Sequence, residues 1–307
     1  MSFWKKIFIL FIISFLLVIP FDCSKNQKKV KKAKSKSMKK YVVQIIAQDY
    51  ITGPEDFAID SNGVLYTALD DGRIISIERD GSKFKTIANT KGRPLGIEID
   101  RNEDLIVCDA KNGLLKINTK GKIEVLSNEH DGRPYKLTDD LDIAKDGKIY
   151  FTDASWKHSG NEIKKDFGQL NGRFLVYDPK TQKVKLLIDT LGFANGVAIC
   201  PDQSYVLVAE TWNHRIIRYW LSGKNKGKHD IFIEKVDGFP DNVTANSDGT
   251  YWLALANDSM LKLDKDGKII NKIVIGKNYP NVTSGLEFKD KLYIGIIKAK
   301  GIGIITL

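Results

Sequence analysis

The stretch that decides the fold is residues 192–220, which read Gly-Phe-Ala-Asn-Gly-Val-Ala-Ile-Cys-Pro-Asp-Gln-Ser-Tyr-Val-Leu-Val-Ala-Glu-Thr-Trp-Asn-His-Arg-Ile-Ile-Arg-Tyr-Trp. This pattern predicts a small apolar strand at Val197–Ile199, an aromatic and β-branched strand at Tyr205–Ala209, and a third strand with mixed faces at Arg215–Tyr219. Pro201–Ser204 is typical of a turn between the first two strands. Three such strands cannot bury both of their faces alone, so the unit requires neighbours of the same kind.

The rest of the chain repeats this unit. The first apolar residue of the innermost predicted strand recurs at steps of 40 to 56 residues, a period that is typical of propellers, at Phe57, Ile97, Leu141, Val197, Val243 and Leu286. A turn and a second strand follow each of these residues, and a third strand follows most of them. We therefore predict an all-β, six-bladed β-propeller over residues 41–307, because six copies in register disfavour a β-sandwich. Tyr41–Ile46 is predicted to be the outer strand of the last blade and to close the ring.

The charge of the chain is concentrated at its beginning. Residues 1–40 hold eleven Lys and one acid, Asp22, which gives a net charge of +10, the same as the net charge of the whole chain. The remainder therefore carries 48 − 11 = 37 basic and 38 − 1 = 37 acidic residues. A neutral globular body without a basic stripe argues against nucleic-acid binding.

The amino terminus is typical of an export signal. Lys5 and Lys6 precede the apolar run Ile7–Phe21, which is short for a membrane-spanning helix and suits a signal peptide. A lipid anchor at Cys23, an uncleaved apolar anchor and plain secretion all remain open. We therefore divide the chain into a signal or anchor at 1–23, a Lys-rich disordered tether at 24–40, and the propeller at 41–307. The expected location is the periplasmic or extracellular face of a membrane.

One position in the repeat carries oxygen donors. It lies two residues before the first apolar residue of each innermost strand, and in four of six blades it holds a carboxylate or an amide: Glu55, Asp139, Asn195 and Asp241, with Asn242 next to the last. Innermost strands converge on the channel of a propeller, so we expect these five residues, called here the oxygen column, to lie together. Their chemistry suits Ca²⁺ and disfavours Zn²⁺, for which His or Cys would be expected. The alternative is that each residue only caps a turn.

The loops that follow the second strands are expected to surround the end of the channel at which the oxygen column lies. They carry His158, Glu210 and His214, which are candidates for a general base.

Several motifs occur in an order that resembles a known family. They include Gly92-Arg93-Pro94-Leu95-Gly96, Ile149-Tyr150-Phe151-Thr152-Asp153, Phe193-Ala194-Asn195-Gly196-Val197 and Gly238-Phe239-Pro240-Asp241-Asn242. Together with further motifs over about residues 50–300, they resemble the strictosidine synthase-like family, and within it the adipocyte plasma membrane-associated protein type. The wider superfamily includes paraoxonases and gluconolactonases, which are six-bladed calcium-dependent hydrolases.

This resemblance implies roles for individual residues. The oxygen column matches the calcium ligands of paraoxonases position by position, although the family commonly has Asn where this chain has Asp139. The resemblance to gluconolactonases implies that Asp241 is both a metal ligand and the general base. Strictosidine synthase depends on a glutamate where this chain has Ser284, so we do not expect its condensation reaction here.

The sequence thus leaves two classes of function open. The first is a membrane-tethered, calcium-dependent hydrolase of esters or lactones, with Asp241, His158 and Glu210 as candidate catalytic residues and Glu55, Asp139, Asn195, Asp241 and Asn242 as metal ligands. The second is a non-catalytic propeller that binds a ligand or a protein and holds calcium for structural reasons. For the first class, we expect a small-molecule ester or lactone as substrate, a membrane contact through the amino terminus, no nucleic acid, and a monomer.

Overall fold

The computed structural model describes residues 41–48, 50–78, 81–276, 278–279 and 281–307. The predicted export signal, Cys23 and the Lys-rich tether lie outside the described residues and stay predictions. Among the described residues, no helix is both long and apolar enough to cross a membrane.

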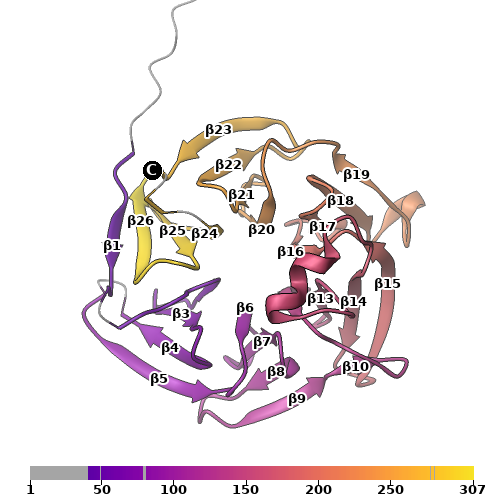
Figure 1. Cartoon of the computed structure of the whole chain (residues 1–307), viewed down its shortest axis with the longest axis horizontal. Coiled ribbons are helices and arrows are strands. Elements are labelled where there is room, and N and C mark those ends of the chain that lie inside the picture. Colours follow the sequence, from indigo (N-terminus) through magenta and orange to yellow (C-terminus); the bar gives the residue numbers. More distant parts are fainter. Residues whose placement is uncertain (1–40, 49, 79–80, 277, 280) are drawn as a thin grey trace, which may run out of the picture. The chain divides into compact units, whose positions relative to one another are not determined.

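The described body is a six-bladed β-propeller, as the repeat predicts, with six four-stranded antiparallel sheets arranged around a ring (Figure 1). The innermost strands of blades one to six are β2 (Phe57–Ile59), β6 (Pro94–Ile99), β12 (Thr138–Ile143), β16 (Ala194–Ile199), β20 (Pro240–Ala245) and β24 (Val282–Phe288). The second strands are β3 (Leu65–Ala68), β7 (Leu105–Asp109), β13 (Ile149–Asp153), β17 (Tyr205–Glu210), β21 (Tyr251–Leu255) and β25 (Lys291–Ile296). The third strands are β4 (Arg73–Ile77), β8 (Gly113–Ile117), β14 (Gly172–Asp178), β18 (Arg215–Trp220), β22 (Ser259–Leu263) and β26 (Ile302–Thr306).

Each blade also has an outermost strand, and five of these were missed by sequence reasoning. They are β5 (Phe84–Asn89), β9 (Ile123–Ser127), β15 (Lys183–Leu191), β19 (His229–Ile233) and β23 (Ile269–Val274). Their side chains are mostly exposed or half-buried, so they lack the continuous apolar runs that mark the inner strands. The described body also contains the hairpin β10 (Glu129–His130) and β11 (Arg133–Pro134), and the short 3₁₀ helices η1 (Gly160–Asp166) and η2 (Gly223–Asn225).

The sixth blade closes the ring as predicted. Its outermost strand is β1 (Gln44–Ile46), which pairs antiparallel with β26 from the other end of the described body. The first and last strands of the body therefore belong to one sheet.

The apolar core consists of six clusters, one between each pair of neighbouring blades. The cluster between blades three and four, for example, joins Tyr150 and Phe174 to Val197 and Val208. The cluster between blades six and one joins Ile302 of β26 to Phe57 of β2. Full burial of one such side chain contributes about 1.5–3 kcal/mol to stability, so each blade is held by both of its neighbours.

The innermost strands bulge at the positions of the oxygen column. In five of the six blades, the pairing of the innermost with the second strand shifts just before the first apolar residue, as between Pro240 and Val243. A bulge leaves two residues opposite one and turns an additional side chain away from the ladder. Neighbouring strands also approach closely there, since a Cβ on Gly196 would lie 2.5 Å from the Cα of Asn242. The bulges of blades three, four and five therefore lie at Asp139, Asn195 and Asp241–Asn242, whereas Glu55 precedes β2 in a blade without a bulge.

Candidate metal centre

The structure brings the oxygen column together at one end of the central channel. The side-chain amide of Asn242 donates a hydrogen bond to Glu55 Oε1 at 2.8 Å, across 187 residues of sequence. The Asn195 side chain donates a hydrogen bond to the Asp241 carboxylate, and Asp139 lies close enough to Asp241 for the two charges to repel each other. Side chains from blades one, three, four and five thus converge, as the repeat predicts.

Three oxygens of this column have no hydrogen-bond partner although they are buried. They are Glu55 Oε2, Asn195 Oδ1 and Asn242 Oδ1. A buried acceptor without a partner costs roughly 1–3 kcal/mol, so several at one place require a compensating ligand. Carboxylate and carboxamide oxygens are the donors that Ca²⁺ takes, and the residues present therefore fit this ion.

Repulsion and burial both act on the acids of the column. Burial raises the pKa of Glu55 well above its usual value, and the charges of Asp139 and Asp56 raise it further. Burial also raises the pKa values of Asp139 and Asp241, with a further contribution from Asp241 on Asp139 and from Glu55 on Asp241. A cation between these groups would relieve the repulsion and stabilise their ionised forms.

Carboxylates alone do not complete the site. In the described body, no three His, Cys, Asp or Glu side chains form a group that could hold an ion by themselves. The donor set therefore needs the amides of Asn195 and Asn242.

Asp241 differs from the other four members of the column, because it is half-buried while they are buried. It is the member best placed to meet a substrate.

His158 lies in the loop that contains η1. Its Nδ1 lies 2.7 Å from Asp166 Oδ1, and Asn171 donates a hydrogen bond to the same oxygen. This pairing fixes the direction of the imidazole and leaves Nε2 for another partner. The loop extends toward blade four, where the ring of Phe167 lies 5.6 Å from that of Trp212. Its role as a base stays a prediction, since among the described residues His158 forms no hydrogen bond or ion pair with the column.

Glu210 has structural partners instead of a free carboxylate. It is completely buried, its Oε1 accepts the backbone N–H of Gly192 at 2.7 Å, and its Oε2 pairs with Arg215. The equivalent residue of blade three, Asp153, likewise accepts a hydrogen bond from a backbone N–H, that of Leu137. In this conformation, Glu210 fixes the loop that leads into the innermost strand and has no oxygen free to take a proton from water.

Replacing Glu210 with glutamine is therefore expected to lower stability and not the rate per folded molecule. Losing a buried, charge-assisted set of hydrogen bonds costs about 1–3 kcal/mol, which corresponds to roughly 2–4 °C in melting temperature for each kcal/mol. Thermal unfolding and ester hydrolysis, measured on the same preparation of Glu210→Gln, check this. A loss of hydrolysis at unchanged stability would restore Glu210 as a candidate base.

Sequence reasoning missed Arg93 as a neighbour of the oxygen column. Its guanidinium donates to the carbonyl oxygens of Pro94 at 3.0 Å and Gly53 at 3.3 Å, and its charge lowers the pKa values of Glu55 and Asp139. Arg93 lies just before Leu95, where blade two has no oxygen ligand. That gap in the column was the signal that could have drawn attention to it.

Comparison with known proteins agrees with this architecture. Residues 42–77 match the model of the strictosidine synthase-like N-terminal family, and residues 139–224 match that of strictosidine synthase. Strictosidine synthase-like protein 4 of Arabidopsis thaliana is 33% identical, over 82% of this chain and 78% of that protein. This chain belongs to the strictosidine synthase-like family. Another relative, the adipocyte plasma membrane-associated protein of Rattus norvegicus, is 37% identical over 74% of this chain and 66% of the rat protein.

Solved structures share the fold of this strictosidine synthase-like chain. A gluconolactonase from Xanthomonas campestris superimposes with a TM-score of 0.72 at 17% identity, covering 87% of this chain and 89% of the other. A calcium-binding protein from Agrobacterium tumefaciens, regucalcin, superimposes with a TM-score of 0.69 at 15% identity, covering 87% and 93%. At these identities the likeness shows the fold alone.

Proposed function

We propose that this strictosidine synthase-like propeller is a calcium-dependent hydrolase of esters or lactones. The observation that carries the proposal is the set of buried column oxygens without partners, Glu55 Oε2, Asn195 Oδ1 and Asn242 Oδ1, beside the half-buried residue Asp241. The similarity to a gluconolactonase and to a calcium-binding propeller supports it at the level of the fold.

The column residues would have two roles, metal binding and proton transfer. Glu55, Asp139, Asn195, Asp241 and Asn242 would hold the ion, which supplies a Lewis acid for the substrate carbonyl and for the oxyanion. Asp241 would accept a proton from the attacking water, because it is the one residue of the column that is half-buried and not buried. The Asn195 hydrogen bond orients that carboxylate. The His158–Asp166 pair is the alternative base.

Hydrolysis of phenyl acetate and of a panel of lactones, with and without a chelator, tests the proposal. Activity that is lost with the chelator and restored by Ca²⁺ is expected. If the protein binds Ca²⁺ but hydrolyses neither class, the function is that of a binding propeller with structural calcium.

We also propose that the protein is exported and held at a membrane through its amino terminus. The relatives described as adipocyte plasma membrane-associated proteins support a membrane location, and the sequence around Cys23 supports a lipid anchor. Metabolic labelling with a fatty acid is expected to mark the protein and to be lost in Cys23→Ser. Membrane-bound protein without label would instead indicate an uncleaved anchor.

A further inference from the structure

A cleft lies between blades three and four, at the end of the blades opposite the metal centre. It has a volume of about 530 Å³ and is lined by the hairpin turn around Lys145, by Gln203, and by the segment from Tyr219 to Gly227. The column residues stand where the innermost strands begin, whereas the hairpins of this cleft follow where those strands end. The volume is in the range of small-molecule sites.

The charge of this cleft is strongly positive within a neutral body. Its lining contains Lys145, Lys148, Lys185 and Lys226 against one acid, Asp146, so the net charge is 4 − 1 = +3. Asp146 pairs with Lys148. Lys185 and Lys226 form no ion pair with any described residue and keep their charges available for a ligand.

Two buried phenols add hydrogen-bond donors to the same cleft. Tyr150 and Tyr219 line it and are each only 8% exposed. Within the described part of the chain, neither hydroxyl has a hydrogen-bond partner. Burial raises the pKa of Tyr150 to about 12 and also raises that of Tyr219, so both hydroxyls stay protonated near neutral pH. Each can therefore donate a hydrogen bond to an anion.

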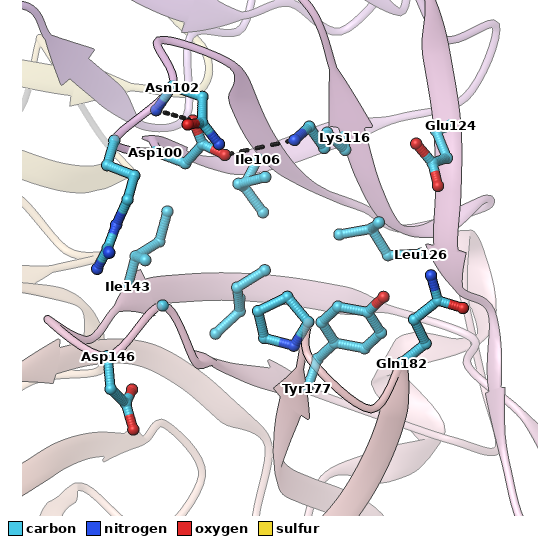
Figure 2. Close-up of a pocket in the computed structure, with 14 residues that line it drawn as sticks. Asp100, Asn102, Ile106, Lys116, Glu124, Leu126, Ile143, Asp146, Tyr177 and Gln182 are labelled. Carbon is cyan, nitrogen blue, oxygen red and sulfur yellow. Dashed lines mark hydrogen bonds and ion pairs between the residues drawn. The ribbon is translucent and has the colours of Figure 1, made fainter.

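The neighbouring pair of blades provides an internal comparison. The cleft between blades two and three, shown in Figure 2, has a volume of about 320 Å³ and is lined by equivalent strand positions. There, Ile106 takes the place of Tyr150 and Glu124 takes the place of Lys185, while Tyr177 corresponds to Tyr219.

The charge of this second cleft has the opposite sign. Arg101 and Lys116 face Asp100, Glu124 and Asp146, which gives 2 − 3 = −1. Lys116 is also occupied by Asp104 at 2.8 Å. Propeller geometry thus forms a cleft in both places, and the cation and donor set is specific to the one between blades three and four.

We propose that the cleft between blades three and four binds the phosphate group of a small phosphorylated molecule. The ammonium groups of Lys185 and Lys226, two phenols and the Gln203 amide offer donors to a dianion, and the walls offer aromatic surface to the group that carries it. Lys148, paired with Asp146, and Lys145, which donates a hydrogen bond to the Pro201 carbonyl oxygen at 3.1 Å, add positive charge nearby. The phosphate could belong to a soluble phosphate monoester or to a phospholipid headgroup, which present the same chemistry. This site is independent of the proposed hydrolase activity.

Calorimetric titration of the full chain with phenyl phosphate, and flotation with phosphatidylcholine vesicles with or without phosphatidic acid, test the proposal. Lys185→Glu imitates the second cleft and is expected to weaken binding at least about tenfold. Lys183→Glu is the matched control, because Lys183 is an exposed residue of the same strand that does not line the cleft. It makes the same change of charge and is expected to leave binding unchanged. Tyr219→Phe keeps the ring and is expected to weaken binding about fivefold.

The two arms of the experiment separate the sources of the phosphate. Binding of phenyl phosphate that depends on Lys185 indicates a soluble ligand, and vesicle binding that depends on Lys185 indicates a lipid headgroup. The amino-terminal lysines are the same in all variants, so the difference between Lys185→Glu and Lys183→Glu reports the cleft alone. Equal effects of these two substitutions, or no binding in either arm, would overturn the proposal.

Discussion

Replacement of Asp241 by asparagine is expected to lower ester or lactone hydrolysis on the order of 10²-fold or more, while calcium remains bound. The asparagine keeps an oxygen for the ion and for the Asn195 side chain, but it cannot take a proton from water. Losing a general base typically costs 10²- to 10⁴-fold in rate. Asp241 suits this role because it is the one half-buried member of the oxygen column, and a bound cation would keep its carboxylate ionised and able to accept a proton. Steady-state kinetics and elemental analysis of Asp241→Asn measure the two quantities.

The matched control for this prediction is Asp139→Asn. It makes the same chemical change at a buried position of the same column, so calcium should stay bound and hydrolysis should fall much less. If Asp241→Asn binds calcium and hydrolyses as fast as the unchanged protein, Asp241 is not the base. The pH dependence of His158→Gln would then show whether the imidazole held by Asp166 takes the proton.

The oxygen column was predictable because strand geometry fixes it. Glu55 and Asn242 are 187 residues apart, yet each lies at the same step of a repeat whose innermost strands share an axis. The repeat also predicted the pairing of the first and last strands, since an unpaired strand at residues 41–46 needs a sheet to join. The outermost strands were not predictable in this way, because strands such as His229–Ile233 contain no fully buried residue and therefore lack the apolar run that marks an inner strand.

The loops around the column were much less predictable, because their conformations depend on contacts that leave no periodic signal. Glu210 looked like a residue of the mouth, but its carboxylate is used by Gly192 and Arg215. Conversely, His158 gains an orienting partner in Asp166, which follows only eight residues later but is brought back by the turn of η1. Arg93 influences the column from a blade that supplies no ligand to it. In each case the role depends on which atoms meet, and the sequence shows only that the groups exist.

Calcium affinity is expected to fall on the order of 10²-fold from pH 7 to pH 5. The ion needs ionised carboxylates, whereas burial and mutual repulsion raise the pKa values of Glu55, Asp139 and Asp241 well above their usual range. Protons therefore compete with the ion, and displacement of one proton for each ion costs about tenfold in affinity for each pH unit. Titration with Ca²⁺ at several values of pH measures this.

The stability of the protein should show the same competition between protons and calcium. Burial raises the pKa of Asp56 to about 6 and that of Asp142 to about 7, both from 3.8, so without calcium the folded state binds more protons than the unfolded state between about pH 4 and pH 7. The stability that these groups contribute is present below pH 4 and is lost as the pH rises through 6 and 7.

With calcium bound, the column carboxylates are ionised in the folded state, so the stability gained from binding the ion increases over the same range of pH. Between pH 5 and pH 7, the stability measured by urea unfolding should therefore fall less with Ca²⁺ than with chelator, and Asp139→Asn should reduce this difference by removing one competing carboxylate. Equal calcium affinity at the two values of pH would show that the column carboxylates do not hold the ion.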